Sequence, residues 1–194
     1  MYRQLVLSPL EPAWVPDSLA ELLGQLAPLG LFGVALADCA VPSGRCYYIG
    51  EYFLQHISFM GCAPAIEFAP SGNQAGSDLS DFTFIHIPEP LAEPRWLADL
   101  TMAKPACPKC KKRIINSAQY INETTSQLRC PHCDTIAHVG EYDWYVFGGY
   151  CRTMLSIVNV YPKEAIPSAH LLSELQRLTT VAWRYFYLQA DLVS

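Results

Sequence analysis

The sequence predicts an α+β fold with a mainly antiparallel sheet, an N-terminal and a C-terminal helix, and a cysteine-rich insert between strands. Two patterns favour this fold. Short runs of aromatic and β-branched residues recur between turn residues, and leucines lie at helical spacing near both ends of the chain. Hydrophobic residues make up 51% of the 194 residues and charged residues 16%, a balance that can fill a sizeable core and that argues against long disorder.

The N-terminal part is expected to hold a strand, a helix and a buried strand, in that order. Residues 2–7 form a short apolar run typical of a strand, and residues 17–27 carry leucines at helical spacing. Ser18, with Glu21 three residues later, matches a capping box at the start of that helix. Residues 31–37 then form an apolar run of strand length, which we expect to be buried.

The middle of the chain is expected to add further strands around an exposed loop. Residues 46–59 and 63–68 are rich in aromatic or apolar side chains and predict strands. Residues 71–81 are rich in Gly, Ser and Asp without periodicity, which is typical of a surface loop. Residues 82–87 alternate in part and predict another strand, and residues 95–102 are compatible with a short helix.

The C-terminal part is expected to hold a hairpin followed by one long helix. Residues 142–147 and 151–161 predict two strands that turn at a pair of glycines. Residues 167–189 predict the helix, because large apolar residues recur there at helical spacing. Within it we expect two leucines to be buried and two arginines to face outward: Leu175, Leu178, Arg177 and Arg184.

Two Cys-x-x-Cys pairs carry the strongest functional signal in the chain. Nineteen residues separate the pairs, which supply Cys107, Cys110, Cys130 and Cys133. Tetrahedral zinc takes thiolates at about 2.3 Å, and each tight turn can supply two of them. The spacing is typical of two-knuckle zinc sites, so we expect one structural zinc ion on these four cysteines. Iron in a rubredoxin-like site stays an alternative, because spacing alone does not separate the two metals.

On these two knuckles, residues 104–139 resemble the zinc-ribbon family. The resemblance covers about 30 of the 194 residues. It implies a three-stranded β module in which the two knuckles hold the metal. We therefore expect a discontinuous main domain of residues 1–103 and 140–194, with the zinc-ribbon module inserted at 104–139. The insert has few large apolar residues, so it should not fold without its metal.

Charge is distributed unevenly between the insert and the remainder of the chain. Residues 104–134 hold six cations and two anions, a net charge of +4 in a chain whose total is -5, so the remainder carries -9. Such a basic segment can contact phosphates, an acidic protein or a second copy of this acidic chain. The predicted partner-binding residues form a compact cluster beside the first knuckle: Lys109, Lys111, Lys112 and Arg113.

These patterns favour a non-enzymatic zinc-ribbon binding or adaptor protein whose partner is a protein or a nucleic acid. The alternative is an enzyme or metal-handling factor with a site around His56 and Cys62, which lie in one segment. A catalytic thiol needs a nearby base or a helix N-terminus to lower its pKa, and the sequence shows neither for Cys62. The chain also lacks a phosphate-binding glycine loop, a Gly-x-Ser-x-Gly motif and a dinucleotide fingerprint.

The remaining sequence signals favour a cytoplasmic protein that does not span a membrane. No stretch reaches about 18 consecutive apolar residues, and the N-terminus lacks the pattern of a secretory signal peptide. Outside the knuckles, four cysteines are scattered in apolar or loop contexts, where a reducing compartment would keep them as free thiols: Cys39, Cys46, Cys62 and Cys151.

Overall fold

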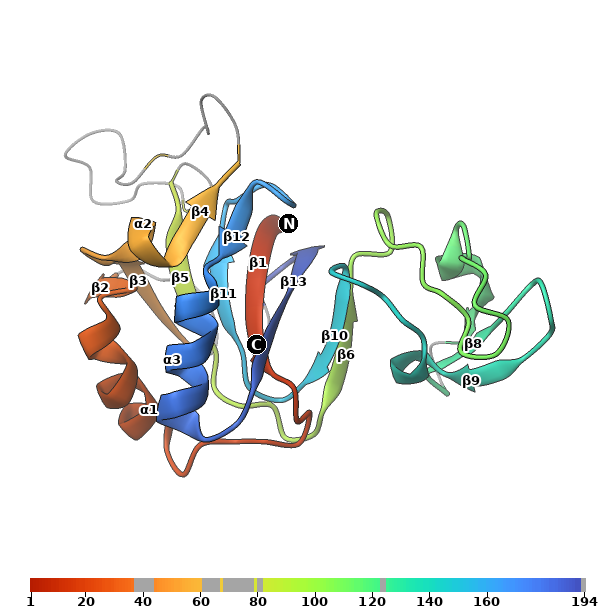
Figure 1. Ribbon diagram of the computed structural model, residues 1–194, viewed down its shortest axis with the longest axis horizontal. Coiled ribbons are helices and arrows are strands. Elements are labelled where there is room, and N and C mark those ends of the chain that lie inside the picture. The colour runs from red at the N-terminus through yellow and green to blue at the C-terminus, as the bar shows by residue number, and fades with distance from the viewer. Residues whose placement is uncertain (37–43, 61–66, 68–78, 80–81, 123–124, 193–194) are drawn as a thin grey trace.

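A six-stranded antiparallel sheet forms the centre of the main body (Figure 1). The computed structural model describes residues 1–36, 44–60, 67, 79, 82–122 and 125–192. The strands lie in the order β13 (Trp183–Ala190), β1 (Tyr2–Pro9), β11 (Leu155–Val158), β5 (Phe84–Ile87), β3 (Arg45–Ile49) and β2 (Phe32–Ala35). Strands β1 and β5 confirm the strands predicted at residues 2–7 and 82–87. A buried strand was expected at residues 31–37. Strand β2 lies there, but it is an edge strand with three of its four residues exposed, so the expected burial is wrong.

The expected α+β fold with terminal helices is wrong, because the described residues are mainly β. They hold thirteen strands and only three α-helices, and strands occupy both ends of the chain. The helices are α1 (Leu19–Leu26), α2 (Phe53–His56) and α3 (Ala169–Thr179), with short 3-10 turns η1 (Ala27–Leu29), η2 (Ser117–Tyr120) and η3 (Val139–Glu141). The long helix expected at 167–189 ends early, since Thr180 adopts a left-handed backbone with φ 62°.

The C-terminal aromatic run forms strand β13 and pairs with β1 along the whole length of both strands. The register runs from Tyr2 opposite Ala190 to Pro9 opposite Trp183. Aromatic residues favour strands, where they pack on a pleated surface. The start of β1 and the end of β13 therefore lie side by side, and the amino group of Met1 contacts Asp191 at 2.9 Å.

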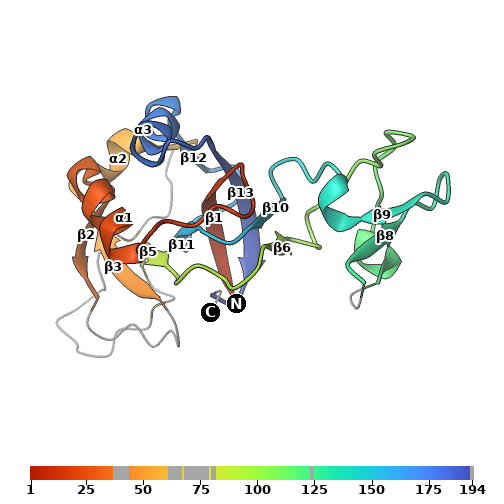
Figure 2. The same ribbon diagram turned by 90° about the horizontal axis from the view of Figure 1, so that it is seen from below.

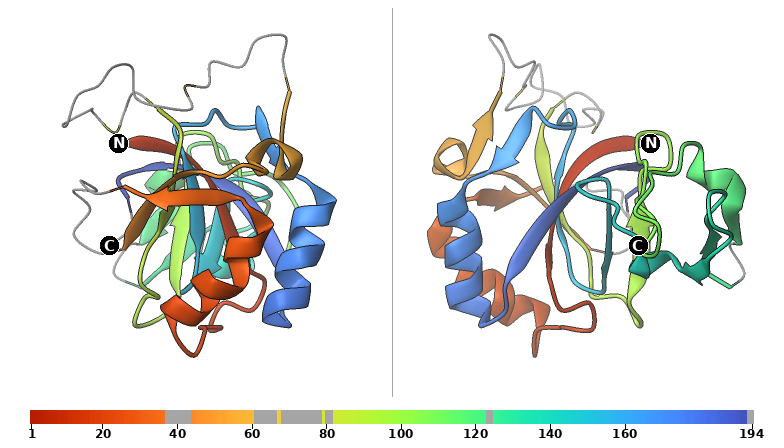
Figure 3. Two further views of the ribbon diagram at one scale, coloured as in Figure 1. Left: turned by 90° about the vertical axis from the view of Figure 1, so that its left-hand side faces the viewer. Right: turned by 45° about the vertical axis from the view of Figure 1, so that its right-hand side comes forward.

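Helices α1 and α3 lie beside each other over one face of this sheet (Figures 2 and 3). The Ser18 hydroxyl accepts a hydrogen bond from the Glu21 N–H at 3.0 Å, which confirms the predicted N-cap of α1. The main core joins leucines of both helices to the strands beneath them, among them Leu22, Leu26, Leu175, Leu5 and Ile157. Each such side chain stabilises the fold by about 1.5–3 kcal/mol on burial.

Of the side chains expected on the long helix, Leu175 is fully buried and Leu178 is half-buried against the main core. Arg177 is exposed on α3 as expected. Arg184 instead lies on β13 and is half-buried, with its guanidinium donating to the Tyr150 carbonyl at 3.3 Å. Burial lowers the pKa of this guanidinium.

Two short antiparallel pairs complete the main body. Strand β6 (Arg95–Ala98) pairs with β10 (Gly148–Cys151), and β4 (Ile57–Phe59) pairs with β12 (Ala165–Pro167). Residues 95–98 thus form a strand where a short helix was expected.

The two glycines expected to turn a hairpin lie inside β10, whose partner is β6. A Cβ atom at Gly149 would lie 2.3 Å from Cε1 of Phe186, so glycine allows β10 to pack closely on β13.

The chain leaves the main body after β6 and returns at β10, and the residues between form a smaller unit to one side (Figure 1). Its sheet has three strands, β7 (Ile121–Asn122), β8 (Gln127–Arg129) and β9 (Ile136–His138), in that order. We call residues 103–147 the cysteine module. The domain boundaries at 103/104 and 139/140 stay a prediction. The strand expected at 63–68 and most of the loop expected at 71–81 lie outside the described residues.

Candidate metal centre

The two cysteine knuckles share one backbone conformation. In the first, the Lys111 N–H donates to the Cys107 carbonyl at 3.0 Å, and in the second the Asp134 N–H donates to the Cys130 carbonyl at 2.9 Å. Both donors adopt a left-handed backbone, with φ 61° at Lys111 and 54° at Asp134. Each turn folds back on its first cysteine, so that both of its sulfur atoms point to the same side.

The knuckles bring four sulfur atoms together, as the sequence spacing predicts. The Sγ atoms of Cys107, Cys110, Cys130 and Cys133 all lie within 4.8 Å of one another. Two pairs that cross between the knuckles, Cys107 with Cys133 and Cys110 with Cys130, are each 3.7 Å apart. Four sulfurs at about 2.3 Å from a tetrahedral zinc ion would be about 3.8 Å apart. The arrangement can therefore hold one metal ion with little movement.

A small core surrounds the sulfur atoms. Cys107 and Cys130 are fully buried, whereas Cys110 and Cys133 are half-buried. The first two pack with the apolar residues of the module, namely Ala103, Ile114, Leu128, Val139, Tyr142 and Trp144. Among the described residues, no histidine or carboxylate joins the four cysteines. The site thus offers four sulfur ligands and no fifth one.

The local environment shifts the pKa values of two of these thiols in opposite directions. Burial raises the pKa of Cys130 to about 12. Hydrogen bonds from Thr135 lower the pKa of Cys133 to about 6, and the two side chains lie 3.3 Å apart. A buried thiolate is costly without a nearby cation, and a divalent metal offsets that cost at all four sulfurs together.

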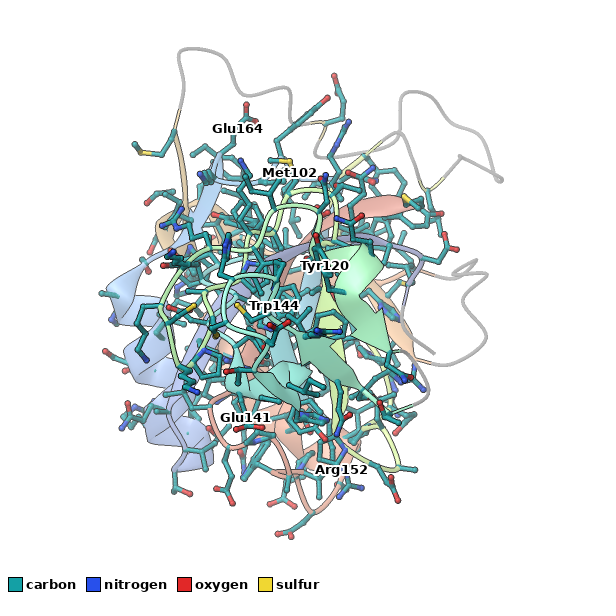
Figure 4. The ribbon with its side chains drawn as sticks, turned by 90° about the vertical axis from the view of Figure 1, so that its right-hand side faces the viewer. Met102, Tyr120, Glu141, Trp144, Arg152 and Glu164 are labelled. Carbon is teal, nitrogen blue, oxygen red and sulfur yellow. The ribbon has the colours of Figure 1, made fainter. Side chains whose placement is uncertain are left out.

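A pair of tryptophans connects the cysteine module to the main body. Trp144, near the centre of the module in Figure 4, packs against Trp96 of β6 with ring centroids 4.6 Å apart. The Trp144 indole N–H donates to the Val139 carbonyl at 2.7 Å inside the module. The module is therefore held on the body through the contact of buried Trp144 with half-buried Trp96, as well as through the two chain crossings.

The predicted basic cluster is exposed on the module. None of the side chains of Lys109, Lys111, Lys112 and Arg113 takes part in a salt bridge within the described residues. The Arg113 guanidinium lies over the Tyr145 ring, 4.5 Å from its centroid. Arg129, by contrast, pairs with Asp134 at 2.6 Å. The cluster therefore keeps its positive charge available at the surface.

The alternative site around His56 and Cys62 is not tested by the described residues. Cys62 lies outside them. His56 is buried, its Nε2 lies 2.8 Å from the Leu29 carbonyl oxygen, and its ring stacks on His170 at 6.1 Å. The contact between His56 and His170 could not be predicted from the sequence, because 114 positions separate the two histidines.

The expectation that the remaining cysteines are free thiols is wrong at Cys46, which is disulfide-bonded. Cys151 is a free and fully buried thiol, as expected, and burial raises its pKa to about 11. Cys39 and Cys62 lie outside the described residues.

Comparison with known proteins identifies no relative of this chain. No protein-family model, curated protein or solved structure matches the chain. None of the helices in the described ranges is both long and apolar enough to cross a membrane.

Proposed function

We propose that this chain is a non-enzymatic binding protein in which a zinc-ribbon module, folded around one structural zinc ion, presents a basic surface to a partner. The observation that carries the proposal is the meeting of four cysteine sulfurs within 4.8 Å of one another. A cluster of four sulfur ligands is typical of structural zinc or of iron. Zinc is the better fit for a small module with two equivalent knuckles.

The role proposed for the metal is structural. Four thiolates complete a tetrahedral shell, so no position remains for water or substrate. Among the described residues, the module's own core cluster holds eight buried residues, two of them cysteine ligands. Such a core contributes little stability by itself, whereas zinc binding to small modules contributes about 10–16 kcal/mol near neutral pH. Removal of the metal should therefore unfold residues 103–147 and leave the main sheet in place.

The partner surface proposed here is the exposed basic cluster, which projects from the same knuckle that binds the metal. Its four cations lie within five consecutive residues and lack a carboxylate partner among the described residues. Their charge suits an anionic partner, and the zinc-dependent fold of the knuckle would fix their positions.

Metal analysis tests this proposal directly. Purified protein should contain one zinc ion per chain, and Cys110→Ser or Cys130→Ser should lose it. Cys151→Ala is the matched control, because this buried thiol lies outside the cluster and its loss should leave the zinc content unchanged. Protein that takes up no zinc on reconstitution, or that carries iron with a red rubredoxin-like absorption, would refute the structural zinc site.

A further inference from the structure

A groove runs along the junction between the cysteine module and the main body. It has a volume of about 490 Å³ and is lined by Met102, Lys104, Arg113, Tyr145, Val146, Phe147 and Lys163. Lys163 belongs to the main body, just before β12, whereas the other residues come from the two crossings and the first knuckle. In Figure 4, Met102 and Glu164, the neighbour of Lys163, lie near the same edge of the molecule. A volume of this size accommodates a ligand as large as one nucleotide.

The groove is strongly cationic for an acidic protein. Three of its seven lining residues are cations and none is an acid. Lys104, Arg113 and Lys163 are all exposed, and no salt bridge within the described parts of the chain engages them. The acids closest in sequence are Asp143, which accepts a hydrogen bond from the Tyr145 N–H at 2.8 Å, and the half-buried Glu164. An anion in the groove would therefore meet positive charge on both sides.

Two aromatic rings lie beneath these cations. Arg113 lies 4.5 Å above the centroid of Tyr145, and the Lys163 ammonium lies 5.5 Å from the centroid of Phe147. Tyr145 is 49% exposed, so a ligand can reach the part of its ring that Arg113 does not cover. Its backbone is left-handed, with φ 52°, an unfavourable conformation for a bulky aromatic residue. Such strain persists where the surrounding structure holds it, and it often marks a binding site.

We propose that this groove binds single-stranded nucleic acid, with one base stacked on Tyr145 and the adjoining phosphates on Lys104, Arg113 and Lys163. The inference rests on the proposed function, since the folded module places Arg113 and Tyr145. Open aromatic faces combined with cations are typical of proteins that bind single strands. A duplex keeps its bases stacked inside and could use only the cations, and an acidic peptide would likewise leave the ring unused.

Fluorescence anisotropy with labelled twelve-nucleotide oligo-dT and oligo-U tests the proposal on the full-length protein. Tyr145→Asn removes the ring but suits the left-handed backbone, and it should weaken binding by roughly tenfold or more. Tyr145→Phe should retain the affinity, because the stacking surface remains. Lys163→Glu should weaken binding of both oligonucleotides. It should also reduce the slope of log affinity against log salt concentration by about one, because one phosphate contact is lost.

Arg45→Glu makes the same charge change as Lys163→Glu on an exposed residue of β3, at the far side of the sheet from the module (Figure 1), and it should leave binding unchanged. Equal affinity for a duplex or for polyglutamate would overturn the proposal, as would equal affinity for free mononucleotide. So would an absence of binding at low salt by protein that carries its zinc. Zinc content is measured on every variant, so that loss of the metal site is distinguished from failure of the groove.

Discussion

The phenolic oxygen of Tyr142 lies 2.7 Å from the carbonyl oxygen of Leu128 and donates a hydrogen bond to it inside the core of the cysteine module. Both residues are buried, and the same oxygen lies 3.2 Å from the carbonyl of Thr135, two residues beyond Cys133. Burial is also the main reason that the pKa of Tyr142 is raised to about 12, which keeps the phenol protonated. One hydroxyl thus ties strand β8 to the turn that carries two of the four cysteines.

Tyr142→Phe should therefore destabilise the zinc-loaded module by about 1–2 kcal/mol, because the buried Leu128 carbonyl loses the phenol as a donor. Urea unfolding followed by tryptophan fluorescence measures the change, since Trp144 lies in the same core. Tyr161→Phe is the control, as that ring is exposed and the change removes only a surface hydroxyl. Equal losses in the two variants would show that the Tyr142 hydrogen bond does not hold the module together.

Two glycine-to-alanine changes should have opposite effects on stability. Gly149→Ala places a methyl group 2.3 Å from Phe186, and relief of this overlap should cost about 1–3 kcal/mol. Gly24 lies on the exposed side of α1 with no atom within 4 Å of its added methyl group. Gly24→Ala should therefore stabilise the protein by about 0.5–1 kcal/mol, because alanine is the better helix former. Thermal melts of both variants against the parent protein test the pair. A neutral Gly149→Ala variant would contradict the packing of β10 on β13.

Local patterns predicted those parts of the molecule that short segments determine. The Cys-x-x-Cys turns bring two sulfurs together by themselves, and the Ser18 cap belongs to the first turn of one helix. The C-terminal error has a physical reason. Residues 183–190 present apolar side chains that fit helical spacing, but their aromatic side chains favour a strand once β1 offers an unpaired edge. That edge is remote in sequence, so no local pattern could show it.

The groove could not be predicted for the same reason. The sequence showed Arg113 as part of a basic cluster, and it showed Tyr145 and Phe147 only as strand residues. Lys163 carried no signal, because an isolated lysine beside a glutamate is ordinary on a protein surface. Only the return of the chain to the main body brings these four side chains to one groove.

The buried thiol of Cys151 should make stability depend on pH in the alkaline range. Its pKa rises from 9.0 to about 11, chiefly because burial disfavours the thiolate. Between those values the unfolded chain releases a proton that the folded chain keeps, so the free energy of unfolding falls as the pH rises. The contribution is intact below pH 9.0 and declines toward pH 11, by up to about 3 kcal/mol at 1.36 kcal/mol for each pH unit.

Urea titrations of the parent protein and of Cys151→Ala from pH 8 to about 10.5 test this prediction. Other groups that lose protons in this range, such as the tyrosines, are common to both proteins. The parent should therefore lose stability more steeply than the variant, whatever the absolute cost of the substitution. Parallel curves would mean that Cys151 ionises as readily in the folded protein as in the unfolded chain, against its full burial.

The C-terminal segment should be indispensable for folding, because it supplies both a helix of the main core and an edge strand of the main sheet. Removal of the residues after Ser168 would take away α3 and also β13, leaving β1 without its partner along eight residue pairs. An unpaired edge of this length exposes backbone donors and acceptors and invites aggregation. The truncated chain should therefore be insoluble or unfolded, and a soluble product with unchanged melting behaviour would contradict the sheet order.

A point substitution tests the helix separately from the strand. Leu175 is fully buried between α3 and the main sheet, so Leu175→Ala should destabilise the protein by about 2–5 kcal/mol through lost burial and the cavity left behind. The neighbouring Gln176 is exposed on the same helix, and Gln176→Ala should change stability by less than about 0.5 kcal/mol. Urea unfolding of both variants gives the comparison. If the two variants had equal stability, α3 would not pack on the sheet, and the covering of that face by α1 and α3 would have to be abandoned.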